Sequence, residues 1–494
     1  MSGVQNGATS CKELICETKD FISEWPCPWD SAVIDEIAPL YKLILKENFS
    51  SLSITASSEA GERLNYNWWC YRKILDNQLE RLLKTMEDAW FGPWGCLLLG
   101  GRLDIEILET VAARLTTDLS PQCDVEVDNN LIGVILSGAQ SVSGAETCLS
   151  QLLLYKSYFG RGACCGEQRF RAFSTNHSDE VKCILTAARS LISEAIGKAD
   201  AIDRQPVILI LDTDVQMLPW ENMPILKSQE VYRMPSVGSI LLKLHQRHQY
   251  HERDKEFEID LPSIDPLRAY YLLNPSGDLN HTQQEFEEWF RNQKWQGKVG
   301  DIPTTEELVF ALQNHDLFLY FGHGSGMQYI RSEEFGKLHC CAAAFLMGCS
   351  SGSLKQRGNY APQGAPLHYL FAGSPSIIAN LWDVSDKDID RFAKTILNSW
   401  IQDSVSLDTC EKCGKSSNLC SKNINNEGNN MVQLERRKAR NAKEIIENEK
   451  CKHCETKLRI TSFIGQARGA CRLSTLIGAS VVCYGVPTIL KRRL

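Results

Sequence analysis

The chain has 494 residues, of which 43% are hydrophobic, so it is long enough for two or three domains with apolar cores. Its net charge of −8 gives no sign of a surface for nucleic acid or an anionic membrane. Residues 1–20 lack a basic stretch followed by an apolar core, and the apolar run 476–490 is too short for a bilayer. We therefore expect a soluble, intracellular protein whose 20 cysteines are reduced thiols, metal ligands or a nucleophile.

Residues 1–120 are predicted to form a helical region. The segments 32–52 and 68–92 carry apolar residues three and four apart, with charges on the other face. Two short apolar runs follow, LIGVILSG at 131–138 and PVILILDTD at 206–214, and the second, which is β-branched and leucine-rich without alternation, is predicted to be a strand.

A helical segment near 180–197 separates these two runs, and a second predicted helix covers 236–251. The charged segment 252–266 is predicted to be a linker, so we expect a separate domain over 121–265.

Residues 266–494 are predicted to alternate between strands and helices. The apolar runs that indicate strands are AYYLL (269–273), DLFLYF (316–321), AAAFLM (342–347) and SIIANL (376–381). Helical patterns at 282–295 and 385–401 follow two of them. This alternation predicts an α/β fold with a mostly parallel sheet and helices on its faces, interrupted by a Cys-rich insertion at about 404–456.

Three of the predicted strands end in chemically unusual residues. His323 lies between two glycines, Cys349 follows Gly348, and Trp382 and Asp383 follow the last of the four strands. Because ligands bind at the carboxyl ends of parallel strands, one sheet edge would gather an imidazole, a thiol and a carboxylate.

This set of groups is suited to acyl transfer by a cysteine nucleophile. A thiolate at Cys349 is a strong nucleophile, and the His323 imidazole can exchange its proton. Gly324 leaves its backbone N–H open to a developing oxyanion, and Gly348 lets substrate approach closely. Each of the two residues also has a simpler explanation. A lone Cys after an apolar strand is usually a buried, inert thiol, and a lone His in a glycine loop is more often structural.

A serine nucleophile is a weaker alternative. The segment GCSSG at 348–352 matches the G-x-S-x-G elbow, with Ser350 in the central position. Hydrolases of that type carry the acid and then the histidine after the serine, but His453 is the only histidine beyond Asp383.

Several motifs, in the same order, resemble separase, a caspase-like cysteine protease that opens cohesin rings at anaphase. The resemblance is carried by FGHGSG around His323, FLMGCSSG around Cys349 and ANLWDVSDKDIDRF after the strand at 376–381. It extends to MLPWENMPIL, YRMPSV, YYLLNPSGDL and ARGACRLSTLIGASVVCYGVP, and covers roughly residues 205–494.

The resemblance implies a caspase-like fold preceded by a helical and degenerate caspase-like substrate-binding part, with LIGVILSG (131–138) and PVILILDTD (206–214) as strands of its sheet. It implies His323 and Cys349 as the catalytic dyad, with the N–H groups of Gly324 and Cys349 as the oxyanion hole. It also implies cleavage after arginine without a cofactor. Asp383 is then our choice to receive the arginine, with Trp382 against its aliphatic stem. Asp386 and Asp388 are alternative acids, and all three acids would also suit a helix N-terminus.

The same resemblance implies the kleisin subunit of cohesin as substrate, a securin-type inhibitor, and a place in the cytoplasm and nucleus. It implies neither direct nucleic-acid readout nor a membrane. Separases carry a long helical region ahead of the protease, so we expect the chain to be a carboxy-terminal fragment or a short form. The alternatives are a non-catalytic separase-like binding module and a caspase-like peptidase of another specificity.

The Cys-rich insertion is predicted to bind zinc. CEKC places Cys410 and Cys413, and CKHC places Cys451 and Cys454, at the spacing that holds tetrahedral zinc. The gap of 37 residues between the pairs is longer than usual, and Cys420 and His453 are further potential ligands. Redox-active dithiols and unligated thiols are the alternatives.

Overall fold

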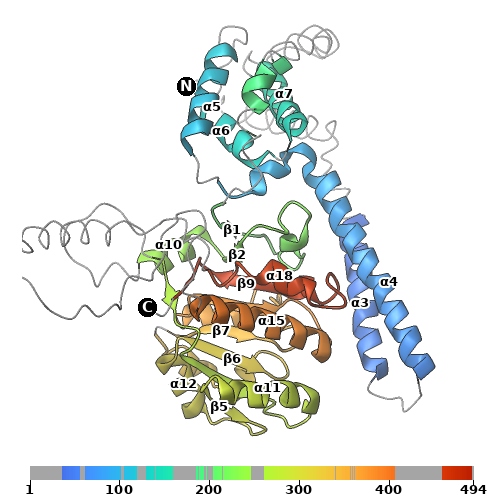
Figure 1. The fold of residues 1–494 in the computed structure, drawn as a ribbon, viewed down its shortest axis with the longest axis vertical. Coiled ribbons are helices and arrows are strands. Elements are labelled where there is room, and N and C mark those ends of the chain that lie inside the picture. The colour runs from blue at the N-terminus through green and yellow to red at the C-terminus, as the bar shows by residue number, and fades with distance from the viewer. Residues whose placement is uncertain are drawn as a thin grey trace, which may run out of the picture. The chain divides into compact units, whose positions relative to one another are not determined.

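The computed structural model describes residues 36–55, 62–101, 105–119, 129–159, 185–245, 261–405 and 459–491, with short gaps at 140, 187, 194–195, 197–203, 214, 340, 357, 359 and 361. It divides into two compact units (Figure 1). The helical unit comprises residues 1–99, 104–199 and 222–227, and the sheet unit comprises 100–103, 200–221 and 228–494. Within the described residues, no helix is both long and apolar enough to cross a bilayer.

The helical unit contains a long helix pair and a smaller bundle. The pair is α3 (Ala38–Thr55) and α4 (Glu62–Met86). The bundle packs α5 (Ile105–Leu119), α6 (Asn129–Gly138) and α7 (Val142–Phe159) around a buried apolar cluster. A π-helical turn, η2 (Glu87–Phe91), and a 3-10 turn, η3 (Gly92–Leu98), connect the pair to the bundle.

The prediction of a strand at 131–138 is wrong, because this run lies in helix α6. Ile132, Ile135 and Leu136 are fully buried in the bundle, while Val134 is exposed. Buried positions three and four apart are the helical period, which so short an apolar run does not reveal by itself.

The sheet unit is built on one eight-stranded sheet with the order β1-β2-β9-β8-β7-β6-β4-β5. The strands are β1 (Val207–Leu209), β2 (Val231–Arg233), β4 (Ala269–Leu273), β5 (Gln296–Val299), β6 (Leu317–Phe321), β7 (Ala343–Leu346), β8 (Ser376–Asn380) and β9 (Val481–Gly485). Every neighbouring pair is parallel except β8 and β9. A separate two-stranded sheet pairs β3 (Ser263–Ile264) with β10 (Ile489–Leu490).

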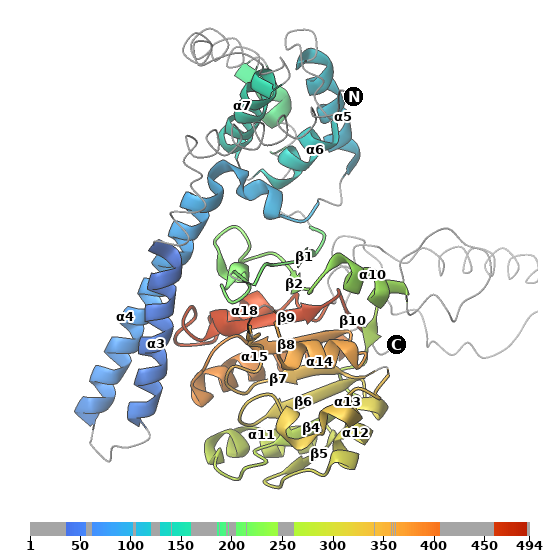
Figure 2. The same cartoon turned by 180° about the vertical axis from the view of Figure 1, so that it is seen from behind.

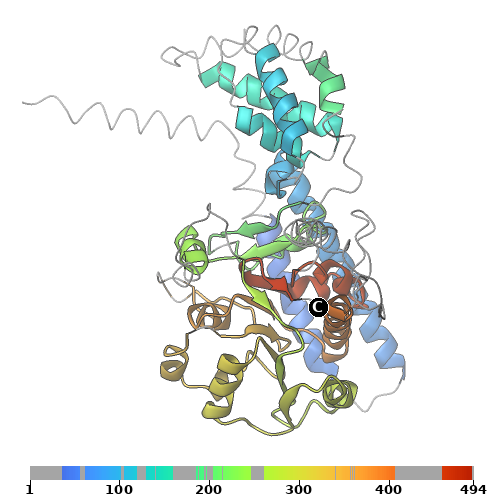
Figure 3. The ribbon, with the colours of Figure 1, turned by 60° about the vertical axis from the view of Figure 1, so that its left-hand side comes forward.

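Helices cover both faces of the large sheet, which confirms the predicted α/β class. Figures 1 and 2 show α11 (Asn280–Asn292), α15 (Asp386–Val405) and α18 (Ile464–Gly469) on one face. The other face carries α12 (Thr305–Asn314), α13 (Ser332–Phe335) and α14 (Ala365–Phe371). In Figure 3 the orange α15 and the red α18 lie side by side. Helix α10 (Val237–His245) lies within the predicted helix at 236–251.

The four strands predicted after residue 266 are confirmed as β4, β6, β7 and β8. The run at 206–214 contains β1, which joins the same sheet through β2 and β9. Residues 204–213 and β2 therefore belong to the same compact unit as the later strands, although the sequence suggested a separate domain over 121–265. Residues 252–260 of the predicted linker lie outside the described residues.

A buried ion pair fastens the segment before β2 to the sheet. Arg233 donates from Nε and from a terminal nitrogen to the two carboxylate oxygens of Glu221, both at 2.6 Å. It also donates to the carbonyl of Leu218 at 2.8 Å, and Arg468 donates to the carbonyl of Glu221 at 3.3 Å. The motifs MLPWEN and YRMP thus have a structural role, because a bidentate pair satisfies both buried charges.

Candidate active site

Strand β6 delivers His323 to the carboxyl end of the sheet. The strand is fully buried, and the chain turns sharply after Phe321, with Gly324 at φ +66°. Two side chains hold the carbonyl oxygen of His323, the Tyr320 hydroxyl at 2.5 Å and the Gln328 amide at 2.8 Å. The backbone at His323 is thereby fixed, while its side chain stays 55% exposed.

Strand β7, the neighbour of β6, delivers Cys349 to the same edge. A Cβ atom on Gly348 would lie 2.0 Å from the carbonyl oxygen of Gly324 and 2.4 Å from that of Gly322. Only glycine fits here, because those contacts are with backbone atoms. The structure therefore brings the His323 and Cys349 loops into contact, as the sequence predicted.

The loop of Cys349 is held by β8 through a network that the sequence did not indicate. Asn380 donates from its side chain to the carbonyl of Gly348 at 3.1 Å. Its carbonyl accepts from the N–H of Gly352 at 2.7 Å, and its N–H donates to the Ser351 hydroxyl at 3.0 Å. Asn380 and Ser351 are both buried, so this network fixes the turn that presents the thiol.

The surroundings of Cys349 favour the neutral thiol. Its sulfur is half-buried and lies 3.4 Å from the carbonyl oxygen of Val384. Burial raises the pKa of Cys349, and the charges of Asp383 and Asp386 raise it further. A thiolate must therefore be generated by a base, and the adjoining His323 loop supplies an imidazole.

The proposed oxyanion donors are available. Within the described part of the chain, the N–H groups of Gly324 and Cys349 donate to no protein acceptor. Gly324 Cα carries no side chain to cover its own N–H, and the N–H of Gly324 borders Gly348, 2.8 Å from the position of a Cβ there. The two donors thus lie on the two loops that touch at Gly348.

The three acids proposed for arginine binding lie in different environments. Asp383 is half-buried and accepts a hydrogen bond from the Ser350 hydroxyl at 2.7 Å. Asp386 is exposed in the first turn of α15. Asp388 is fully buried. Its carboxylate accepts hydrogen bonds from the side chain of Arg391 at 2.6 Å, from the N–H of Arg472 at 2.8 Å and from the N–H of Leu473 at 3.1 Å. Asp388 is therefore a structural residue, and Asp383 and Asp386 remain as the accessible acids.

Trp382 is more deeply buried than its proposed role suggests. Its ring is 4% exposed, and its indole N–H donates to the carbonyl of Leu476 at 2.9 Å. This ring therefore anchors the segment before Asp383 to the interior and presents little surface to a substrate.

Asp278 is a residue of the site that no sequence motif indicated. This residue lies in the loop after β4, and its Oδ2 is 2.8 Å from Nε2 of His323. Since β4 pairs with β6, both loops leave the same edge of the sheet. The order of strands, which the sequence alone does not give, brings the two residues together.

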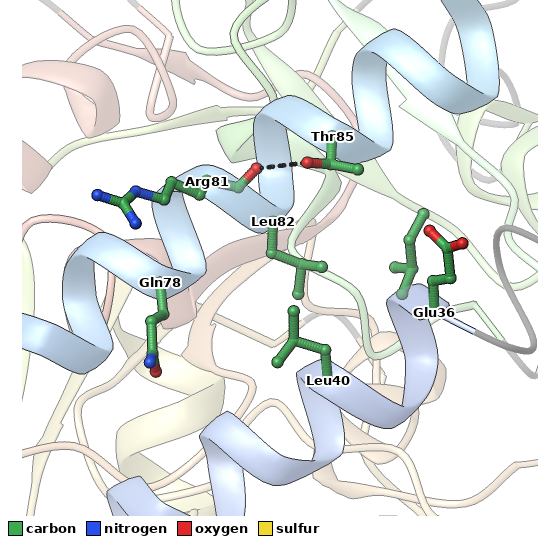
Figure 4. Close-up of a pocket in the computed structure, with 7 residues that line it drawn as sticks. Glu36, Leu40, Gln78, Arg81, Leu82 and Thr85 are labelled. Carbon is green, nitrogen blue, oxygen red and sulfur yellow. Dashed lines mark hydrogen bonds between the residues drawn. The ribbon is translucent and has the colours of Figure 1, made fainter.

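A cavity of about 260 Å³ lies on the α3–α4 helix pair (Figure 4). Leu40 and Leu82 face each other at its centre, and Glu36 and Arg81 lie at its margin. Its remaining lining residues are Ile37, Gln78 and Thr85. None of its lining residues is one of those proposed for the site around Cys349.

No group of three or more potential metal ligands occurs among the residues that the structure describes. Cys410, Cys413, Cys451 and Cys454, with Cys420 and His453, lie outside those residues. The zinc site therefore stays a prediction.

Comparisons with known proteins show the family to which the chain belongs. The sequence model of the separin protease domain matches residues 28–389, well over half of the chain. The chain belongs to the separin protease-domain family. It is 31% identical to separin of Emericella nidulans over 453 residues, covering 88% of this chain and 19% of that protein. It is 33% identical to separin of Mus musculus over 341 residues, covering 68% of this chain and 14% of that protein.

The fold of a separin relative is also known from a solved structure. The crystal structure of the Saccharomyces cerevisiae separase–securin complex at 2.6 Å resolution matches with a TM-score of 0.66 and 23% identity. The match covers 92% of this chain and 28% of that one. The chain thus spans between about a seventh and a quarter of the separins it matches in sequence.

Proposed function

We propose that this chain is the protease part of a separase-type cysteine endopeptidase, which cleaves the kleisin subunit of cohesin after arginine and so releases sister chromatids at anaphase. The observation that carries the proposal is the packing of Gly348 against Gly322 and Gly324 in a chain of the separin protease-domain family. That packing holds the loops of Cys349 and His323 together.

The proposed reaction is acyl transfer through a thioester. His323 accepts the proton of Cys349, and the sulfur attacks the carbonyl carbon of the arginine residue. The N–H groups of Gly324 and Cys349 stabilise the oxyanion of the tetrahedral intermediate. Its collapse breaks the peptide C–N bond, and the imidazolium protonates the leaving amine. Water then hydrolyses the thioester and restores the thiol.

Asp383 is proposed to bind the guanidinium of the arginine. Its carboxylate is half-buried beside Cys349, and the Ser350 hydroxyl orients one of its oxygens. A carboxylate and a guanidinium form a bidentate pair that is strengthened when water is excluded. Asp386 is the alternative acid, since its charge, like that of Asp383, raises the pKa of Cys349.

The proposal extends to partners and location. The yeast structures with the similar fold are of a separase–securin complex, and this supports a securin-type inhibitor here. We propose the nucleus and cytoplasm as its location, since its substrate is chromosomal. Catalysis requires no cofactor, because the thiol, the imidazole and the two N–H donors suffice for each step.

A covalent probe tests this function. An arginyl peptide acyloxymethyl ketone, which loses its carboxylate leaving group to a thiolate, should alkylate Cys349 in the wild-type chain. Peptide mapping by mass spectrometry locates the adduct. Cys349→Ser should not react, and His323→Ala should react far more slowly, although both remain folded. Labelling at another cysteine, or no labelling of the folded wild type, would favour a non-catalytic binding module.

A further inference from the structure

We infer that Asp278 is a positioning residue that orients the imidazole of His323 for the reaction. This inference rests on the proposed protease function, and it adds a third side chain to the pair His323–Cys349. The juxtaposition that carries it is the 2.8 Å contact between Oδ2 of Asp278 and Nε2 of His323.

This contact determines which nitrogen of His323 can act as the base. An ionised carboxylate only accepts hydrogen bonds, so Nε2 must carry the proton. Nδ1 then has a free lone pair, and no described residue donates to it. Nδ1 is therefore the nitrogen that takes the proton of Cys349.

The loop that carries Asp278 is built around Asn274. Asn274 is fully buried in the left-handed region at φ 51°. Its side-chain oxygen accepts from the N–H of Leu279 at 2.9 Å, and its carbonyl accepts from the N–H of Gly277 at 3.0 Å. Its side-chain nitrogen donates to Gln283 at 2.9 Å. One buried asparagine thus closes the turn on both sides of Asp278.

The same asparagine ties the loop to the strand that carries His323. The N–H of Asn274 donates to the carbonyl of Phe321 at 2.7 Å, two residues before His323. On the other side, Tyr320 and Gln328 fix the carbonyl of His323. The backbones on both sides of the pair are therefore held, although both side chains are more than half exposed.

Asp278 would contribute in two ways. It holds the ring and its tautomer in the state that accepts a proton, and it stabilises the imidazolium formed when Cys349 ionises. A base that is itself oriented by a third group is a general arrangement for activated nucleophiles. The side-chain contact of Asp278 is with His323, through which it would act, so we expect its effect on kcat rather than on KM.

The test compares Asp278→Ala, Asp278→Asn and Asp278→Glu in the full chain, with Asp301→Asn as a control on another exposed aspartate of the sheet unit. We expect Asp278→Ala to lower kcat about 10- to 100-fold, short of the roughly 10²–10⁴-fold that general acid–base catalysis contributes. KM should not change. Asp278→Asn should be at least as impaired, because its amide can donate to Nε2 and move the ring proton to Nδ1. Asp278→Glu should recover part of kcat, and the control should behave as wild type.

A second readout does not require turnover. In ¹⁵N-histidine NMR spectra, assigned with His323→Ala, the wild type should show the proton of His323 on Nε2, and Asp278→Asn should show it on Nδ1. A wild-type kcat in Asp278→Ala, or an unchanged tautomer in Asp278→Asn, would overturn the inference. Failure of the wild type to cleave would instead overturn the proposed function, and the tautomer would still report on Asp278.

Discussion

At the scale of single residues, the site places its nucleophile beside acids that oppose its ionisation. Burial and the carboxylates of Asp383 and Asp386 all raise the pKa of Cys349, so the resting enzyme holds a neutral thiol. A substrate arginine bound at Asp383 would neutralise one of these charges. In the proposed reaction, binding of the arginine would therefore favour ionisation of the thiol.

Asp383→Asn tests this link in the free protein. Removing the charge should lower the pKa of Cys349, so the pH midpoint for its alkylation by iodoacetamide should move downward. The same variant should lose about 3–5 kcal/mol of binding to an arginine substrate in the transition state, because the guanidinium has no counter-charge. Alkylation is followed by mass spectrometry and cleavage by kcat/KM. A midpoint that moves upward or stays, or loss of arginine preference in Asp386→Asn alone, would contradict the assignment.

Asp388 should respond differently from Asp383. Its buried carboxylate holds the backbone of Arg472 and Leu473, so Asp388→Asn removes a charge that accepts three hydrogen bonds. We expect a loss of about 3–5 kcal/mol in the free energy of unfolding, measured by urea denaturation. Asp383→Asn should remain close to wild type in the same experiment. Equal free energies of unfolding for the two variants would show that the hydrogen bonds of Asp388 do not stabilise the fold.

At the scale of elements, the site is an outcome of strand order. The loops after β4, β6, β7 and β8 leave one edge, and they bring Asp278, His323, Cys349 and Asp383 to it. Glycine at position 348 lets two of these loops touch. The strand order brings the four side chains to one edge, and Gly348 determines how closely the His323 and Cys349 loops approach each other.

Gly348→Ala should therefore impair activity without removing any functional group. The new methyl group would meet the backbone of Gly322 and Gly324 at distances that no real Cβ shows, so the two loops must separate. Overpacking of this kind costs typically about 1–3 kcal/mol of stability. We expect a fall in kcat of at least tenfold in a chain that still folds, monitored by circular dichroism. Gly358→Ala, where a Cβ meets no atom but φ is +61°, serves as the control for backbone strain alone. Equal kcat in Gly348→Ala and wild type would show that the loops need not touch.

The sequence predicted the central strands of this sheet well, but it did not predict the edge strand β5. The runs that became β4, β6, β7 and β8 are apolar because both of their faces are covered, and so His323, Cys349 and Asp383 were found at their ends. Strand β5 reads QGKV, since an edge strand is partly exposed, and it was missed. Asp278 was missed because its partner lies on β6, and the pairing of β4 with β6 is not written in either segment.

At the scale of the whole molecule, the residues of the proposed site all lie in one unit of the described structure. The groups that carry the proposed chemistry lie between Asn274 and Asp386, all in the sheet unit. We therefore expect the Cys-rich insertion to affect the stability of its own segment and not the chemistry at Cys349.

Zinc analysis of the purified chain tests that expectation. If Cys410, Cys413, Cys451 and Cys454 bind the metal, the chain should carry about one zinc equivalent, with sulfur ligands near 2.3 Å by X-ray absorption. Chelation should increase proteolysis at residues 404–456, because the binding energy of the metal stabilises the segment. The alkylation rate of Cys349 should not change in Cys410→Ser. Absence of zinc would favour free or redox-active thiols, and a slower Cys349 would show that the insertion reaches the site.

The most direct test of the central claim is cleavage of a kleisin peptide that contains one arginine, with the products located by mass spectrometry. The wild-type chain should cut once, after the arginine, and should not cut the peptide in which alanine replaces that arginine. Cys349→Ser and His323→Ala should lose this cleavage while keeping the circular dichroism spectrum of the wild type. Cleavage by either variant at the wild-type rate, or a cut at another position, would contradict the account.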